Sequence, residues 1–543
     1  MHLTGTTYDE LIANFRWELP ARFNVAEATV SRHARAAPDA VALIEVQPAG
    51  DRRLWTFAAI ERDACRLANA LAAHGVTRGT VVAVHLSQSA ETLISHLAIL
   101  KLGAISMPLF GLFGPDAVRF RLEDSGAPIL ITNASHLERV AAGLADLPSL
   151  RRIISVDGAG PLGALSWADL VEQGAASHTA CDTAADDPAF LMYTSGTTGN
   201  PKGVLHAHRV LIGHLPGVCV PHDLFPQAGD RFWTPADWAW AGGLFDVLLP
   251  SLYFRVPVVS HRMPRFDPEA AFALMAAYDV RNVFMPATAL RLLRQVPNPR
   301  LRHAYRLRSL ASGGEPLGAD MLAWGQETFG LTMSEFFGQT EVNLVVGNCP
   351  SIFPPRPGSM GRAIPGHTVE IIDAAGNVLA PGEAGVVAVR RPDPVMLLEY
   401  WRQPEATAAK FRGDWCLMGD VATKDSDGYF WFQGRDNDII KSSGYRIGPG
   451  EVEECLAKHP AVALAGVIGT PDPLRGQAVT AFILPAQGFA PSPALEAEIQ
   501  AFVKERLASH EWPRKIRFVT EMPMTVTGKI RRVDLRALDR DPD

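Results

Sequence analysis

The stretch "YTSGTTGNPKG", Tyr193 to Gly203, decides how this chain is interpreted. It combines three glycines, four serine or threonine hydroxyls, one proline and one lysine, and it lies between two apolar runs. Glycines let a backbone turn tightly and bring its N–H groups close to an anion, while hydroxyls add donors and lysine adds charge. The composition therefore predicts a loop that binds phosphate groups. Its candidate contacts are Thr194, Ser195, Gly196, Thr197, Thr198 and Lys202.

This loop is not the common phosphate-binding pattern G-x-x-x-x-G-K-[ST], because Pro201 and not glycine precedes Lys202. A surface turn rich in small residues is the alternative interpretation of any such segment. Other parts of the chain must therefore agree before the phosphate interpretation carries weight.

Composition limits the classes of function. A chain of 543 residues exceeds one ordinary hydrophobic core, so at least two domains are expected. The net charge of -7 gives no basic field for nucleic acid. Six scattered cysteines without ligand spacing indicate a reduced, cytoplasmic protein, and the absence of a long apolar run predicts no membrane span.

Strand and helix patterns alternate through the first part of the chain. Residues 81–86 predict a buried strand and residues 90–102 a helix that Gly103 ends. Repetition of this order predicts an α/β fold, in which mostly parallel sheets are covered on both faces. From about Gly366 the pattern changes to short strands with turn residues, which predicts a small β subdomain over residues 366–434. Residues 435–543 predict a separate α+β domain.

The loop "TSGTTGNPKG" resembles the signature loop of the adenylate-forming superfamily, which includes acyl-CoA synthetases, luciferases and nonribosomal adenylation domains. Four more segments resemble elements of that superfamily, in the same order, so the resemblance spans nearly the whole chain. These segments are "ASGGEPLG", "FFGQTE", "WCLMGDVATKDSDGYFWFQGRDNDIIKSSGYRIGPGEVE" and "PMTVTGKIRR".

The resemblance implies a role for each matching residue. Phe337 would lie against adenine, Thr340 would touch the α-phosphate, and Glu341 would hold Mg²⁺. Other implied nucleotide contacts are Gly314, Glu315, Pro316, Phe336, Gly338, Gln339, Asp420, Arg435 and Arg446. Ser443 and Gly444 would meet the pantetheine arm of coenzyme A.

The resemblance also implies a fold of stacked N-terminal α/β sheets (residues 1–434) and a mobile C-terminal domain (residues 435–543). Superfamily members catalyse two half-reactions. A carboxylate first attacks ATP to give an acyl-adenylate and pyrophosphate, and a thiol then displaces AMP. Lys529 would be the catalytic lysine of the first step, together with Thr340 and Glu341. Asn437 stands where many relatives carry the hinge aspartate. Lys529 also resembles a lysine regulated by acetylation, so an acetyltransferase or deacetylase is a possible partner.

Within the superfamily, the chain looks most like medium-chain acyl-CoA synthetases and their acetyl-CoA synthetase relatives. Acetate-specific relatives carry tryptophan where this chain has Gly338, so glycine is expected to leave volume for a medium-chain, branched or aromatic acid. Gly338→Trp is then expected to shift preference toward acetate or propionate. The expected pocket residues are Trp240, Gly242, Gly243, Phe245 and Gly338.

Alternatives remain open at this point. The acyl group could pass from the adenylate to a carrier protein and not to coenzyme A. Light production from an oxidised adenylate also occurs in this superfamily, but no residue pattern in this chain indicates that activity. His206 and His208 in "HAH" could suggest a metal site, but alternate residues point to opposite faces of a strand, so a structural role is expected.

Overall fold

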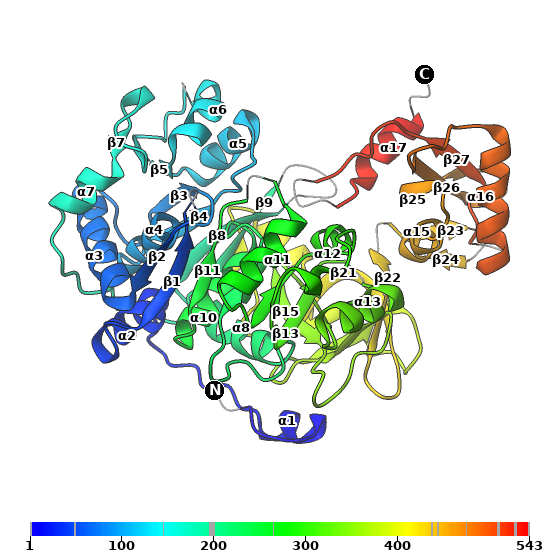
Figure 1. The fold of residues 1–543 in the computed structure, drawn as a ribbon, viewed down its shortest axis with the longest axis horizontal. Helices are drawn as coiled ribbons and strands as arrows, with labels where there is room; N and C mark the ends of the chain where they lie inside the picture. The colour runs from blue at the N-terminus through cyan, green and yellow to red at the C-terminus, as the bar shows by residue number, and fades with distance from the viewer. Residues whose placement is uncertain are drawn as a thin grey trace. The chain divides into compact units, whose positions relative to one another are not determined.

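Two compact units make up the chain in this computed structural model (Figure 1). The larger contains residues 1–194, 202–369 and 389–414, and the other contains residues 370–388 and 415–543. The structure describes residues 3–47, 50–144, 146–194, 201–263, 265–315, 317–435, 438–442, 445–473, 475–507, 511–525 and 529–540, without the side chains of Lys441, Tyr445, Arg446 and Glu451.

One sheet of the larger unit has eight strands in the order β19-β9-β8-β4-β3-β5-β6-β7. Strands β3 to β8 pair in parallel in its centre, whereas the β8–β9 and β9–β19 pairs are antiparallel. The bounds are β3 Val81–His85, β4 Ile105–Pro108, β5 Ile129–Thr132, β6 Arg152–Ser155, β7 Leu165–Ser166, β8 Pro188–Thr194, β9 Lys202–Ala207 and β19 Glu399–Tyr400.

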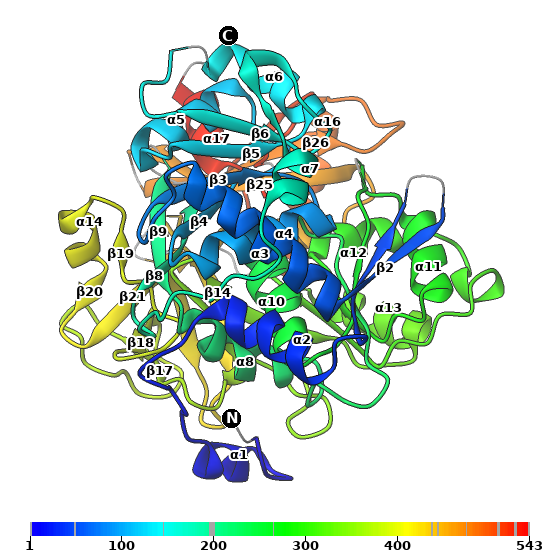
Figure 2. The same ribbon diagram turned by 90° about the vertical axis from the view of Figure 1, so that its left-hand side faces the viewer.

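Helices cover both faces of this sheet because successive strand residues point to opposite sides. Val82 and Val84 join the core beneath α3 (Phe57–Ala73) and α4 (Ala90–Lys101). The alternate residues of β3 join the opposite core, under α5 (Pro115–Ser125) and α6 (Ala134–Leu144). Figure 2 shows α3 and α4 in blue and α5 and α6 in cyan around these strands.

A second sheet of the larger unit runs β16-β15-β14-β13-β12-β10-β11-β1-β2. Strands β1 and β10 to β14 pair in parallel, and β2, β15 and β16 are antiparallel to their neighbours. The bounds are β1 Val41–Val46, β2 Arg52–Thr56, β10 Phe232–Trp233, β11 Val258–Ser260, β12 Asn282–Phe284, β13 Ser309–Gly313, β14 Ser334–Gln339, β15 Val342–Gly347 and β16 Ser359–Ala363.

One face of this second sheet packs on α11, α12 and α13, and the other shares its core with α8 and α10. These helices span Val210–Cys219 (α8), Leu249–Tyr253 (α10), Pro268–Ala277 (α11), Ala287–Leu293 (α12) and Ala319–Phe329 (α13). The remaining elements of the unit are α1 Tyr8–Asn14, η1 Glu27–Ser31, α2 Arg32–Ala36, η2 Pro161–Gly163, α7 Trp167–Gln173, α9 Ala241–Gly243, η3 Leu244–Leu248, η4 Pro299–Leu301, α14 Pro404–Ala409 and β20 Phe411–Arg412.

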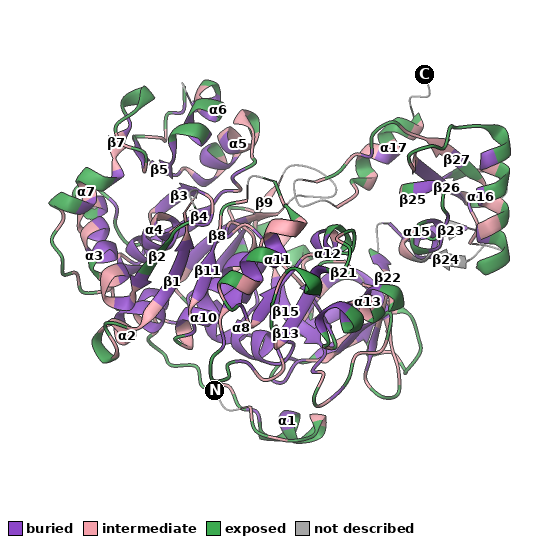
Figure 3. Cartoon of the chain, viewed as in Figure 1, coloured by how far each residue is buried: buried purple, intermediate pink, exposed green. Residues whose placement is uncertain are grey.

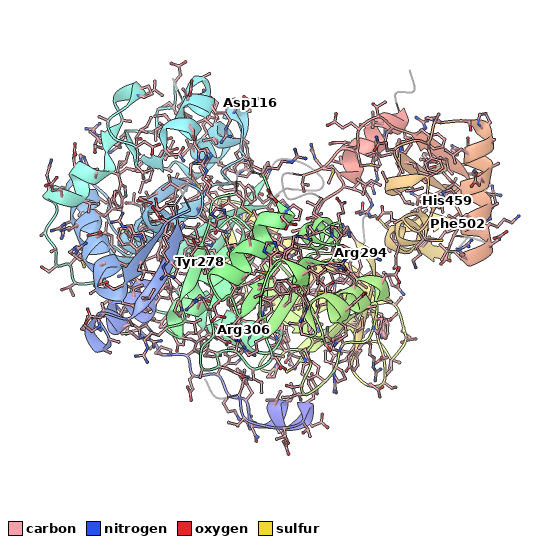
Figure 4. The ribbon with its side chains drawn as sticks, viewed as in Figure 1. Asp116, Tyr278, Arg294, Arg306, His459 and Phe502 are labelled. Carbon is pink, nitrogen blue, oxygen red and sulfur yellow. The ribbon has the colours of Figure 1, made fainter. Side chains whose placement is uncertain are left out.

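The smaller unit contains two groups of strands. The first follows the order β17-β18-β21-β22, and the second forms a five-stranded sheet in which β24-β23-β26-β25 are neighbours and β27 pairs with β26. His459 and Phe502 pack edge to face in the core beside the second group, with ring centroids 4.9 Å apart (Figure 4). The bounds are β17 Val369–Ile372, β18 Gly385–Arg390, β21 Trp415–Lys424, β22 Phe430–Arg435, β23 Ile440–Ser442, β24 Tyr445–Ile447, α15 Pro449–Leu456, β25 Val462–Asp472, β26 Gly476–Pro485, α16 Pro493–Arg506, β27 Lys515–Phe518 and α17 Arg532–Arg540.

The predicted α/β fold with an α+β C-terminal region is confirmed. Gly103 follows α4 with a φ of 65°, a left-handed angle that suits glycine at a helix end. Most strands of the larger unit are buried, although the edge strand β2 is largely exposed, and many residues of helices such as α7 and α16 are exposed (Figure 3). The boundary between residues 434 and 435 stays a prediction. No described helix has the length and apolar character needed to span a membrane.

Glu335, on β14, is a buried carboxyl group that ties this strand to the segment after β13. Its Oε2 accepts a hydrogen bond from the Leu317 backbone N–H at 3.0 Å. The side chain is 6% exposed, and burial raises its pKa to about 7. The folded state therefore keeps this proton over a pH range in which the unfolded chain has lost it.

Glu335→Gln is expected to remove part of the pH dependence of stability. The pKa is raised in the folded state, so the free energy of unfolding of the wild type should fall as pH rises from about 4.5 to about 7. Glutamine keeps an acceptor for Leu317 but has no proton to lose. Denaturant unfolding at several pH values checks this, and a wild-type-minus-variant difference that stays constant with pH would contradict it.

Candidate active site

An antiparallel hairpin of β8 and β9 carries the ends of the loop predicted to bind phosphate. Thr194 is the strand partner of Lys202, so the lysine that is predicted to bind phosphate lies opposite a hydroxyl residue. A Cβ on Gly203 would lie 2.9 Å from Leu191 Cδ1 and 3.1 Å from Trp401 Cβ, which explains a glycine there. The other predicted loop residues, Ser195, Gly196, Thr197 and Thr198, lie outside the described residues.

Thr340 and Glu341 form the short turn between β14 and β15, since Gln339 pairs with Val342. His206 on β9 holds this turn: its Nε2–H donates to the Thr340 carbonyl at 2.8 Å. Burial lowers the pKa of His206 to about 4, so the ring is neutral at physiological pH and acts as a hydrogen-bond donor. The strand after the predicted phosphate loop and the Thr-Glu turn therefore contact each other directly.

The other histidine of "HAH" also has a backbone partner. The Val25 backbone N–H donates to Nδ1 of His208 at 3.2 Å. Among the residues that the structure describes, no cluster of three metal-ligating side chains is present. These contacts agree with the structural role predicted for both histidines.

Glu341 is held by two contacts that the sequence did not indicate. The Tyr400 hydroxyl donates to its Oε1 at 2.6 Å, and the Leu397 backbone N–H donates to its carbonyl at 2.9 Å. Tyr400 pairs with Val204 of β9, and the Lys202 Nζ lies 5.0 Å from the centroid of the Tyr400 ring. Strand β9 thus brings the predicted phosphate lysine and the predicted metal-binding carboxylate to the same tyrosine.

Gln339 and the two phenylalanines of "FFGQTE" differ in their surroundings. Lys410 Nζ donates to Gln339 Oε1 at 3.1 Å, a contact that the sequence did not predict. Phe336 is buried with its ring centroid 5.2 Å from that of Phe284, whereas Phe337 is half-buried. The adenine contact assigned to Phe337 stays a prediction.

The residues expected to line the acyl pocket divide into two groups. Trp240 is half-buried, its ring centroid is 5.6 Å from that of Phe284, and a Cβ on Gly242 would lie within 2.8 Å of both rings. This aromatic row continues to Phe336. By contrast, Phe245 is buried against Phe190 and two histidines, and a Cβ on Gly243 would lie 2.4 Å from the Asp237 carbonyl. The second group is packed as core.

The expectation that Gly338 leaves open volume is wrong at its own Cβ position. Gly338 lies where the pairing of β14 with β15 is irregular. A Cβ there would lie 2.4 Å from the Leu344 backbone nitrogen and 2.7 Å from Asn343 Cα. Since backbone atoms cannot move aside cheaply, Gly338→Trp would disrupt the strand pair and cannot serve as a simple test of acid size.

Three residues after β13 are predicted to line the adenine pocket, and the structure describes two of them. Gly314 has a φ of 91°, which favours glycine, and Glu315 forms an ion pair of 2.9 Å with Arg291. Pro316 lies outside the described residues.

Asp420 and Arg435, predicted to meet the ribose, lie opposite each other on β21 and β22. Arg435 Nε is 3.8 Å from Asp420 Oδ1, and the aspartate is 4% exposed while the arginine is exposed. A carboxylate can accept from two vicinal hydroxyls, so the pair suits a ribose.

Lys529 lies in the smaller unit, next to an isolated antiparallel bridge between Met524 and Ile530. Its backbone N–H donates to Thr525 Oγ1 at 3.0 Å, and its carbonyl accepts from the Thr525 N–H at 2.7 Å. Arg446 is on β24, but its side chain is not described. The predicted coenzyme A residues Ser443 and Gly444 and the predicted hinge Asn437 lie outside the described residues.

Comparison with known proteins identifies two family matches. Residues 30–401 match the AMP-binding enzyme family, and residues 451–529 match the AMP-binding enzyme C-terminal domain. The chain is 36% identical to acetyl-coenzyme A synthetase of Bacillus subtilis (98% of this chain, 94% of that protein). It is 34% identical to mitochondrial acyl-coenzyme A synthetase ACSM2B of Homo sapiens (97% and 93%).

Solved structures give the same result. The anthranilate CoA ligase AuaEII in complex with anthranoyl-AMP superposes with a TM-score of 0.87 at 30% identity, over 96% of this chain and 98% of that one. A benzoate CoA ligase from Burkholderia xenovorans superposes with a TM-score of 0.82 at 28% identity, over 95% and 100%. The chain therefore belongs to the AMP-binding enzyme family, as an adenylate-forming acid–thiol ligase of the acyl-CoA synthetase type.

Proposed function

We propose that this ligase activates a medium-chain, branched or aromatic acid with ATP, releases pyrophosphate, and transfers the acyl group from acyl-AMP to coenzyme A. The observation that carries this proposal is the arrangement around β9. Lys202 begins the strand, His206 binds the Thr340 carbonyl, and Tyr400, beside the strand, binds Glu341. Groups suited to phosphate and to a cation are thereby fixed in one rigid sheet region.

The first half-reaction must join two anions, so neutralising and positioning them is the main task of the protein. Two unit charges about 4 Å apart interact by about 4 kcal/mol at an effective dielectric near 20. Lys202 would neutralise phosphate charge from the larger unit, and Lys529 would bridge the carboxylate and the α-phosphate. In the second half-reaction, Ser443 and Gly444 would contact the thiol arm.

Mg²⁺ is implied by the family, and the residues present suit it. The Glu341 carboxylate, oriented by Tyr400, and the Thr340 hydroxyl are hard oxygen donors of the kind that Mg²⁺ prefers. When bound, the ion would neutralise charge on the nucleotide phosphates. Glu341 is the residue proposed to hold it.

An acid larger than acetate is proposed because Trp240, which is half-buried, supplies an aromatic, apolar side chain that packs on the buried Phe284, and Phe284 in turn contacts Phe336 of the "FFGQTE" segment. The names of the relatives do not decide the substrate, since they include acetyl, anthranilate and benzoate enzymes. Acetylation of Lys529 by a partner enzyme, which would remove its charge, stays a prediction, and so does a cytoplasmic location.

Lys529→Ala is expected to lower the rate of acyl-adenylate formation by about a hundredfold to a thousandfold, because a positioned cation is lost. Conversion of supplied acyl-adenylate to the thioester should remain. Pyrophosphate release and thioester formation are measured separately, with Lys515→Ala on an exposed part of β27 as the control. Equal loss in both half-reactions would show that Lys529 has no step-specific role.

Carrier-protein ligation is the alternative acceptor reaction, and coenzyme A dependence separates the two. With a panel of acids, AMP production by a coenzyme A ligase should require coenzyme A for multiple turnovers. Multiple turnovers without coenzyme A would favour the alternative.

Gly242→Ala is expected to shift preference toward smaller acids. The added methyl group would lie 2.7 Å from Phe284 and 2.8 Å from Trp240, so the Trp240 ring must move and narrow the aromatic wall. The KM of the largest accepted acid should rise about tenfold or more, with little change for the smallest. Gly114→Ala, at a glycine with open space around it, is the matched control. If the variant shows the same preference among acids of different size as the wild type, Gly242 and Trp240 do not line the acyl pocket.

A further inference from the structure

Tyr400 joins the two charged groups of the larger unit that the proposed chemistry uses. Its hydroxyl donates to Glu341 Oε1 at 2.6 Å, and its ring centroid lies 5.0 Å from Lys202 Nζ. A hydrogen bond to a carboxylate is short and stronger than a neutral one, and an ammonium is attracted to the face of an aromatic ring. One side chain therefore contacts the cation with its ring and the anion with its hydroxyl.

The backbone of Tyr400 is held firmly enough to orient these contacts. Tyr400 pairs with Val204 in the β9–β19 ladder, and its N–H donates to Thr407 Oγ1 at 2.9 Å. The side chain is only 5% exposed. A buried ring on a hydrogen-bonded strand has few alternative rotamers, so the position of its hydroxyl is set by the sheet.

Lys202 and Glu341 are residues of opposite formal charge, and the Tyr400 side chain contacts both of them. A direct ion pair between the two would occupy the ammonium and the carboxylate together. The tyrosine satisfies the carboxylate with a neutral hydroxyl and the ammonium with a neutral ring. Each charge stays available for a ligand of opposite sign.

We propose that Tyr400 is a positioning residue for the first half-reaction, which orients Glu341 toward the metal–nucleotide complex and keeps Lys202 available for phosphate. This inference rests on the roles of Glu341 and Lys202 in the proposed function. It assigns a role to a residue outside the "FFGQTE" and "TSGTTGNPKG" segments, 59 positions along the chain from Glu341. No contact of Tyr400 with the substrate is needed.

Tyr400→Phe tests this inference because it keeps the ring beside Lys202 and removes only the hydroxyl. We expect the affinity for ATP in the presence of Mg²⁺ to fall about tenfold, from loss of a hydrogen bond to a charged group. Titration calorimetry without any acid measures this directly. Affinity for ATP without Mg²⁺ should change less than twofold, and so should the conversion of supplied acyl-adenylate to thioester.

Tyr305→Phe is the matched control. Tyr305 is also 5% exposed, and its hydroxyl donates to the Thr328 carbonyl at 2.9 Å, far along the chain from Glu341. A loss of stability common to both variants would measure the cost of removing a buried hydroxyl. Only Tyr400→Phe should lose Mg²⁺-dependent ATP affinity.

A double-mutant cycle with Glu341→Gln separates positioning from a general effect. In the Glu341→Gln background, Tyr400→Phe should cause little further loss of Mg²⁺-dependent ATP affinity. The inference is overturned if Tyr400→Phe leaves that affinity unchanged, or if its effect is the same in both backgrounds. The binding assay contains no acid and no thiol, so its outcome is independent of errors in the proposed acid or acceptor.

Discussion

Strand β9 is the element on which the candidate site depends. It is hydrogen-bonded on both edges, to β8 and to β19, and it begins at the lysine of the predicted phosphate loop. Its buried His206 binds the carbonyl of the Thr-Glu turn. The Thr340–Glu341 turn and β19, both far from β9 in the chain, are thus held against one strand. A shift of β9 by one residue would turn each of its side chains to the other face.

The polar groups that hold the site together are neutral, while those offered to a ligand are charged. Burial keeps the His206 ring uncharged, and Tyr400 contributes a phenol and an aromatic face. Lys202 and Glu341 are the side chains that the proposed function assigns to phosphate and to a cation. Such preorganisation suits a reaction between two anions, since the groups that stabilise charge are already in place before the substrates react.

The sequence predicted the fold class from alternating strand and helix patterns, and the structure confirms it. The site residues that the sequence proposed lie within short motifs, and their roles stay predictions. The sequence did not predict the partners of those motifs, because such contacts are set by the sheet and not by local spacing. His206 is 134 positions from Thr340, Tyr400 is 59 from Glu341, and Lys410 is 71 from Gln339. Gly338 illustrates the opposite error: a glycine suggested open space, but the neighbouring backbone of β15 fills it.

The central claim is that the acid becomes bonded to the α-phosphorus of ATP before any thiol reacts. Labelling both carboxylate oxygens of the acid with ¹⁸O tests it most directly, with mass spectrometry of the AMP formed in the presence of coenzyme A. The account predicts one ¹⁸O atom in each AMP released. Release of AMP that contains no ¹⁸O would contradict it.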